Sequence, residues 1–314
     1  MSQSTDKKKK KNFLYNTKEE LTLHAMALPA LAALFVFSYL PMFGIVIAFK
    51  KLNVAKGILG SDWVGFKNFQ FLFASTDAWN ITRNTVGYNI VFILLNTTLA
   101  MTLAILINEL YSTRLAKVLQ TIYIMPHFLS MAVVSIIVFA FLSARNGFLN
   151  GILQDLFGKQ PVNWYNDRTW WPLFFVIIHA WKGVGYSSVV YLAAITGISK
   201  EYYEAAIIDG ASKVQQIRYI TLPHLRTMMA ILLLMAVGGI FRGDFGLFYL
   251  VPQNSGVLYP VTDVIDTYVY RAMTMLNNPG MAAAAGLYQS LVGFVLIITV
   301  NRIVSKIDPE SALF

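Results

Sequence analysis

Residues 199–223 read SKEYYEAAIIDGASKVQQIRYITLP and separate two long apolar stretches of the chain. Ser199 can cap a short helix, and Glu201 follows it at the positive end of the helix dipole. Gly210 supplies the left-handed residue that ends such a helix. We therefore expect a short, well-terminated helix in the middle of an otherwise apolar region.

A second helix is predicted directly after the first. Ser212 and Gln215 have the spacing of a capping box, in which each side chain accepts a hydrogen bond from the other residue's backbone. We expect this helix to stop before Pro223, because the residue before a proline avoids the helical conformation. The segment is thus a compact helix pair, continuous with the apolar stretch that follows it.

The composition around this segment identifies a membrane protein. Of 314 residues, 56% are hydrophobic and 13% are charged, against about 45–50% and 25% in soluble domains. A disordered, collagen-like or coiled-coil chain is excluded as well, because each needs a polar, glycine-periodic or heptad composition. The chain contains no cysteine, which excludes disulfides and thiolate sites.

Six apolar windows are long enough to cross the hydrocarbon core as helices, which takes about 20 residues. We therefore predict an all-α integral membrane protein with six transmembrane helices and a kink at Pro126 in the third. The windows are Ala25–Phe49, Thr85–Leu110, Val118–Leu142, Trp171–Ile195, Thr227–Tyr249 and Ala282–Val304.

The charge distribution gives an orientation. The net charge is +9, and five lysines, Lys7–Lys11, precede the first window. Such a cluster marks the cytoplasmic side and attracts anionic lipid, so we predict membrane lipid rather than nucleic acid as its partner. An even number of spans puts both termini, and the 199–223 loop, in the cytoplasm.

The loop also carries a family resemblance. Glu204-Ala205-Ala206, then Gly210, then Ile220, and finally Leu222-Pro223 match, at every defined position, the EAA loop of binding-protein-dependent ABC importer permeases. In that family the loop is a coupling helix that docks into the ATPase subunit. The alternative is a loop that only caps two helices. The resemblance implies the coupling role for Glu204, Ala205, Ala206, Asp209, Gly210, Ile220, Leu222 and Pro223.

Further stretches resemble the carbohydrate-uptake permeases, and within them the polysaccharide branch of the alginate and aldouronate type. Arg242-Gly243 departs from the pattern, where smaller or amide residues are expected. The matching stretches are residues 28–30 (LPA), 39–44 (YLPMFG), 63–69 (WVGFKNF), 181–183 (WKG), 244–249 (DFGLFY) and 263–271 (DVIDTYVYR).

The resemblance implies a permease subunit of an oligosaccharide importer in the bacterial cytoplasmic membrane. No G-x-x-x-x-G-K-[ST] run is present, so we do not expect this chain to hydrolyse ATP, and the resemblance implies a non-catalytic subunit rather than an enzyme. The implied partners are a second homologous permease chain, two ATP-binding-cassette ATPases that bind ATP and Mg, and an extracellular lipoprotein or soluble sugar-binding protein. We predict no cofactor and no metal in this chain, because its four histidines are scattered.

Two other functions fit this sequence less well. An autonomous secondary transporter or channel usually shows inverted repeats and midplane carboxylates, and neither is clear here. An intramembrane hydrolase needs a nucleophile and a base that converge, and His179 has no obvious partners in the sequence.

Polar residues inside the windows are candidates for the substrate path, because polar groups in hydrocarbon usually face a cavity or a neighbouring helix. Sugars bind through hydrogen bonds to hydroxyls and through aromatic faces. The candidates are Asn89, Asn96, Trp181, Lys182, Tyr186, Tyr191, Arg242 and Asp244.

Each candidate has a structural alternative. Lys182 can pair with a carboxylate on another helix, and Arg242 with Asp244 can form an ion pair that stabilises a gate. Asn89 and Asn96 form one polar stripe with Thr85 on the second span. For this stripe we favour hydrogen bonds between helices over contacts with a ligand. Nearby, Gly183 and Gly185 leave room for a close backbone approach or a local unwinding.

These spans and loops divide the chain into four parts. We predict a basic cytoplasmic tail (1–24), a first helix with an outer loop (25–84), a permease core of five helices that includes the coupling loop (85–305), and a cytoplasmic C-terminal tail (306–314).

Overall fold

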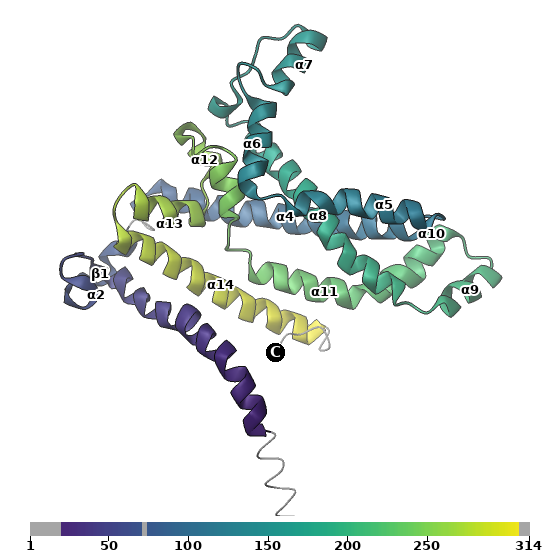
Figure 1. Ribbon diagram of the computed structural model, residues 1–314, viewed down its shortest axis with the longest axis horizontal. Coiled ribbons are helices and arrows are strands. Elements are labelled where there is room, and N and C mark those ends of the chain that lie inside the picture. Colours follow the sequence, from purple (N-terminus) through teal and green to yellow (C-terminus); the bar gives the residue numbers. More distant parts are fainter. Residues whose placement is uncertain (1–19, 71–73, 308–314) are drawn as a thin grey trace, which may run out of the picture. The chain divides into compact units, whose positions relative to one another are not determined.

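The computed structural model describes residues 20–70 and 74–307, almost all of them in helices or short connections (Figure 1). The lysine run and most of the expected C-terminal tail lie outside the described residues. The chain divides into two units, residues 1–68 and 69–314.

The first unit is one long helical segment followed by a small polar turn. Glu20–Phe49 is long and apolar enough to cross a membrane, and the amide of Asn68 donates to the carbonyls of Ala48 and Lys50 at its end. The later elements of this segment are η1 (Phe35–Tyr39), η2 (Leu40–Phe49), β1 (Lys50–Lys51), α2 (Gly57–Gly60), the antiparallel partner strand β2 (Asp62–Trp63) and η3 (Gly65–Phe69).

The second unit contains the remaining helices. In chain order they are α4 (Thr76–Asn108), α5 (Thr113–Ile124), η4 (Met125–Phe128), α6 (Met131–Leu142), α7 (Phe148–Phe157), η5 (Trp164–Asn166), α8 (Trp171–Thr196), α9 (Lys200–Ile208), α10 (Lys213–Gln216), η6 (Ile217–Thr221), α11 (Leu222–Gly238), η7 (Gly246–Leu250), η8 (Gly256–Leu258), α12 (Tyr259–Thr262), α13 (Ile265–Thr274) and α14 (Pro279–Ile307).

The all-α membrane architecture is confirmed. In the described part of the chain, five helices are long and apolar enough to span a membrane, and a bent pair makes a sixth. That pair, Thr113–Phe128 and Met131–Leu142, is bent by 98°. The break follows Pro126 within η4, so the predicted kink is a full interruption of the helix.

The fifth span differs from its predicted bounds at both ends. The helical path runs from Lys213 to Gly238 without stopping before Pro223, so that expectation was wrong. The reason is the wider π turn η6, in which the N–H of Leu222 donates to the carbonyl of Ile217. Pro223 then enters in the first turn of α11, where its missing N–H is tolerated. At the other end, Gly239 follows the helix, well short of the predicted Tyr249.

The centre of the unit is the long packing of α4 against α8, with α11 and α14 side by side next to it (Figure 1). Gly185 on α8 lies against the backbone carbonyl of Tyr123 on α5, so closely that a Cβ atom would overlap it. The close approach predicted for this glycine is therefore present, whereas α8 shows no unwinding between Trp171 and Thr196.

We predict that Gly185→Ala destabilises the protein by about 1–3 kcal/mol, because the overlapping atom is backbone and cannot rotate away. Gly183→Ala is the matched control, since its Cβ would meet only the Asn96 side chain at 3.6 Å. Both changes add the same helix propensity. Thermal unfolding in detergent measures the difference, and equal transition temperatures would contradict the prediction.

Candidate functional site

The 199–223 loop folds as its capping residues predict. Ser199 Oγ accepts the N–H of Glu201 at the start of α9, and Gly210 has a φ of 79° after its end. The capping box of α10 is also confirmed, with Gln215 Oε1 2.7 Å from the N–H of Ser212. The capping residues therefore define where α9 and α10 begin and where α9 ends.

α9 exposes a mixed polar and apolar surface. Glu204, Ala205 and Asp209 are exposed, and Ile207 and Ile208 are 58% and 86% exposed. We call these five residues the α9 surface. Exposed isoleucines in a polar loop are costly unless a partner covers them. Both isoleucines lie within the stretch from Glu204 to Gly210 for which the resemblance implies coupling, although neither was singled out there.

Two contacts join α9 and α10 to neighbouring helices. The hydroxyl groups of Tyr203 and Thr221 are 2.9 Å apart, which links α9 to η6. Lys213 Nζ lies 3.0 Å from the carboxylate of Glu109, the residue that ends α4. The other predicted coupling residues, Ile220, Leu222 and Pro223, lie on η6 and α11 rather than on α9. They form the stem of the loop.

A pocket of about 370 Å³ lies between α4, α8 and α11. We call it the central pocket. It brings together four of the predicted path residues, Asn89, Asn96, Tyr186 and Tyr191, and adds His179 and Ser187, which the sequence analysis did not select for the path. Trp181, Lys182, Arg242 and Asp244 do not line it.

Asn89 and Asn96 each form a hydrogen bond to another segment of the chain, which is the structural alternative that the sequence favoured. Asn89 Nδ2 donates to the carbonyls of Ile240 and Arg242, at 2.9 and 3.0 Å. Asn96 Nδ2 donates to Ser187 Oγ at 2.9 Å, while its Oδ1 is buried and has no hydrogen-bond partner. Both asparagines therefore hold neighbouring segments of the pocket wall together.

Lys182 makes a structural contact other than the predicted one with a carboxylate, and its place on the substrate path stays a prediction. Its Nζ donates to the backbone carbonyl of His127 at 2.7 Å, so pairing with a carboxylate is wrong. Tyr186, one turn further along α8, stacks on the ring of His127 at 4.2 Å. Both side chains therefore support η4 at the break of the third span.

Arg242 and Asp244 are exposed in the break between α11 and η7. The ion pairs of the described residues do not include one between them, so the expected gate pair is not formed. Asp266 holds the break instead, since its carboxylate accepts the N–H of Gly243 at 2.5 Å and the amide of Gln289 at 3.0 Å. Burial raises the pKa of Asp266, and these donors oppose the shift.

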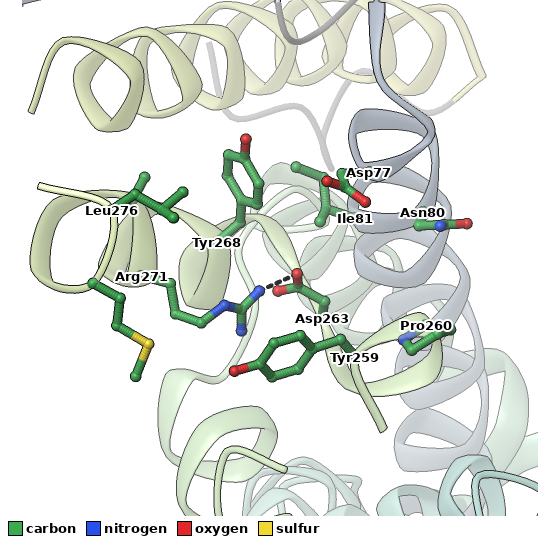
Figure 2. Close-up of a pocket in the computed structure, with 11 residues that line it drawn as sticks. Asp77, Asn80, Ile81, Tyr259, Pro260, Asp263, Tyr268, Arg271 and Leu276 are labelled. Atoms are coloured by element: carbon green, nitrogen blue, oxygen red, sulfur yellow. Dashed lines mark hydrogen bonds and ion pairs between the residues drawn. The ribbon is translucent and has the colours of Figure 1, made fainter. Parts of the chain in front are cut away.

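A second pocket, of about 310 Å³, lies between the start of α4 and the helices α12 and α13 (Figure 2). We call it the α4–α13 pocket. Figure 2 shows the guanidinium of Arg271 directed at the carboxylate of Asp263, with which it forms a buried ion pair. The guanidinium also lies 3.9 Å from the centre of the Tyr259 ring. Burial raises the pKa of Asp263, and Arg271 counteracts the rise.

The 263–271 motif therefore has a structural explanation. Asp263 pairs with Arg271, Asp266 holds the break after α11, and Thr267 Oγ1 bonds to Asp263 at 2.6 Å. Tyr270 packs edge-on against Phe245. No group of three His, Cys, Asp or Glu side chains in residues 20–70 and 74–307 could hold a metal ion.

Comparisons with known proteins agree on one family. The model of the "Binding-protein-dependent transport system inner membrane component" family matches residues 96–309. Two relatives come from Bacillus subtilis (strain 168). Protein LplB is 33% identical over 93% of this chain and 91% of its own. The polygalacturonan/rhamnogalacturonan transport system permease protein YteP is 32% identical over 97% and 94%.

Two solved structures are similar over nearly the whole chain. One is a bacterial ABC transporter involved in the import of the acidic polysaccharide alginate, with a TM-score of 0.85 and 32% identity over 95% of this chain and 99% of the other. The other is a bacterial alginate ABC transporter in complex with a periplasmic protein that holds an alginate pentasaccharide. It has a TM-score of 0.84 and 32% identity over 93% of this chain and 97% of the other.

Proposed function

Because this chain belongs to the family of binding-protein-dependent transport system inner membrane components, we propose that it is the permease subunit of an ATP-driven oligosaccharide importer. Within the chain, the α9 surface is the main observation that supports this proposal. It presents Ile207 and Ile208 to the surroundings on a short helix fixed at both ends. The relatives' saccharide names and the alginate transporter support the substrate class.

In this proposal the α9 surface docks into a separate ATPase, which binds ATP and Mg. Both chain termini and the 199–223 loop face the cytoplasm. Movement of the ATPase displaces α9. The Tyr203–Thr221 contact transmits this displacement to η6 and α11, and the Lys213–Glu109 contact transmits it to α4. A second permease chain completes the pathway, and the two chains alternate between outward and inward states as rigid bodies.

The central pocket is the proposed path for the saccharide. Asn89, Asn96 and Ser187 give this pocket polar groups that suit the hydroxyls of a sugar. The rings of Tyr186 and His179 line the same pocket, each with one face already stacked, on His127 and on Phe92, so that only the other face can meet a sugar. Arg242 does not line the pocket, so it would contact the saccharide before the saccharide enters this pocket or after it leaves. A sugar-binding protein on the outer side delivers the substrate.

Purification of the tagged chain in a mild detergent, followed by mass spectrometry, tests the proposal. Wild type should retain a P-loop ATPase and a second permease. A Glu204→Lys, Gly210→Pro double variant should lose the ATPase selectively, because proline cannot adopt the positive φ of residue 210.

Asp155→Lys, Gly158→Pro on α7 is the matched control. Gly158 also ends its helix with a positive φ, of 61°, and the control should keep the ATPase. A stable wild-type protein that retains no ATPase would refute the proposal. Uptake driven by an ion gradient in such a preparation would establish a secondary transporter instead.

A further inference from the structure

We propose that the α4–α13 pocket is a saccharide subsite, which binds a single sugar unit through its hydroxyl groups. The inference rests on the proposed function, because that function supplies both the orientation and the substrate class. It adds a second binding site, separate from the central pocket.

The location of the pocket is the first argument. Asp77 and Ile81, in the first turns of α4, line it, whereas Glu109 at the other end of α4 contacts Lys213 in the 199–223 loop. A helix of this length separates the two ends by about 50 Å, at roughly 1.5 Å per residue. Since the loop faces the cytoplasm in the proposed orientation, the pocket lies on the outer side, where substrate arrives.

The size of the pocket is the second argument. Its volume of about 310 Å³ is at the lower end of the roughly 300–1,000 Å³ that small-molecule sites have. It can therefore hold one sugar ring of a longer chain, with the rest of the chain outside.

The chemistry of the lining is the third argument. Asp77 and Asn80 on α4 supply hydrogen-bonding groups on one side, and Tyr268, Met275 and Leu276 supply apolar area. Polar groups beside apolar and aromatic surface match the hydroxyls and the C–H face of a pyranose. Arg271 is already fixed by Asp263 and Tyr259, so it presents its remaining N–H groups without losing further freedom.

The charge of the lining selects among sugars. Arg271 is neutralised by Asp263, while the ion pairs of the described residues leave Asp77 without a partner. In Figure 2 Asp77 lies on the α4 side of the pocket, across from the Arg271–Asp263 pair. The Asp77 carboxylate, which has only the positive end of the α4 dipole beside it, repels a uronate and accepts hydrogen bonds from neutral hydroxyls. A neutral sugar unit therefore fits better than an acidic one.

The chain has no native cysteine, so a single introduced cysteine can report occupancy in the assembled transporter. Met275→Cys places a thiol in the lining, and its rate of labelling by a maleimide is measured with maltose, galactobiose or digalacturonate. Met273→Cys is the matched control, because Met273 is 60% exposed, Met275 is 55% exposed, and only Met275 lines the pocket.

A neutral disaccharide should slow the labelling of Met275→Cys and leave Met273→Cys unchanged. Adding Asp77→Asn to Met275→Cys should raise the sugar concentration needed for protection at least tenfold. Protection by digalacturonate alone would overturn the preference for neutral sugars. Protection by the binding protein without sugar would show a protein-docking surface instead.

A preparation that transports one of these sugars and shows no protection would refute the subsite and leave the proposed function intact. A preparation without an ATPase and without transport would refute both. The two failures are therefore distinguishable in one experiment.

Discussion

Ile208→Glu should abolish ATP-driven uptake, because it removes the ATPase from the complex. Ile208 is 86% exposed on the α9 surface, and burying such a side chain in a partner is worth about 1.5–3 kcal/mol. A glutamate buried there without a partner adds a further penalty of a few kcal/mol. Since each 1.4 kcal/mol is a factor of ten, we expect the affinity for the ATPase to fall about 100-fold or more.

The measurement is the amount of ATPase that co-purifies with the variant, together with saccharide uptake by cells. Leu59→Glu is the matched control, because Leu59 is 91% exposed and belongs to the first unit, whereas the loop belongs to the second. The control should keep its ATPase, and the second permease should remain bound to both variants. If Ile208→Glu retained a normal amount of ATPase, the α9 surface would not be the docking site.

Arg271→Met should cause the largest loss of stability. Arg271 and Asp263 form a buried ion pair in which the side chains are only 11% and 10% exposed. Removing the arginine leaves the aspartate buried without a counter-charge, which costs about 3–5 kcal/mol. Thermal unfolding in detergent measures this loss. Arg168→Met is the control, because Arg168 is exposed and should tolerate the change.

The pH dependence of that loss gives a second check. Burial already raises the pKa of Asp263, and Arg271 opposes the rise. In Arg271→Met the pKa should therefore rise further, so that the folded protein binds a proton more readily than the unfolded chain. The variant then gains stability as the pH falls and loses it as the pH rises through the folded pKa. A deficit that grows on acidification would contradict this explanation.

The features predicted correctly from the sequence are those that depend on neighbouring residues. The termination of α9 by Ser199 and Gly210, and the capping box of Ser212 and Gln215, are decided by residues within a few positions of one another. The prediction that the helix stops before Pro223 was wrong, although it too was based on neighbouring residues. There a π turn, η6, shifts the hydrogen-bond register and lets the helix continue.

Residues far apart in the chain decided the rest. Lys182 meets a backbone carbonyl that only the break in the third span makes available. Asp266 holds Gly243 and Gln289, which lie more than 20 residues away on either side. Neither contact has a periodicity or a spacing that a sequence could display. The partners of a polar side chain in such a fold depend on where helices break and cross.

The sequence by itself therefore determined the membrane class and the family. Apolar window length, composition and motif spacing are properties of the chain that no packing changes. The tertiary structure alone decided which polar residues share a pocket, since α4, α8 and α11 must first pack together. It also joined Asp77 of α4 to the Asp263–Arg271 pair, nearly 200 residues later in the chain. Long-range packing sets such distances because each helix fixes only the direction of its own side chains.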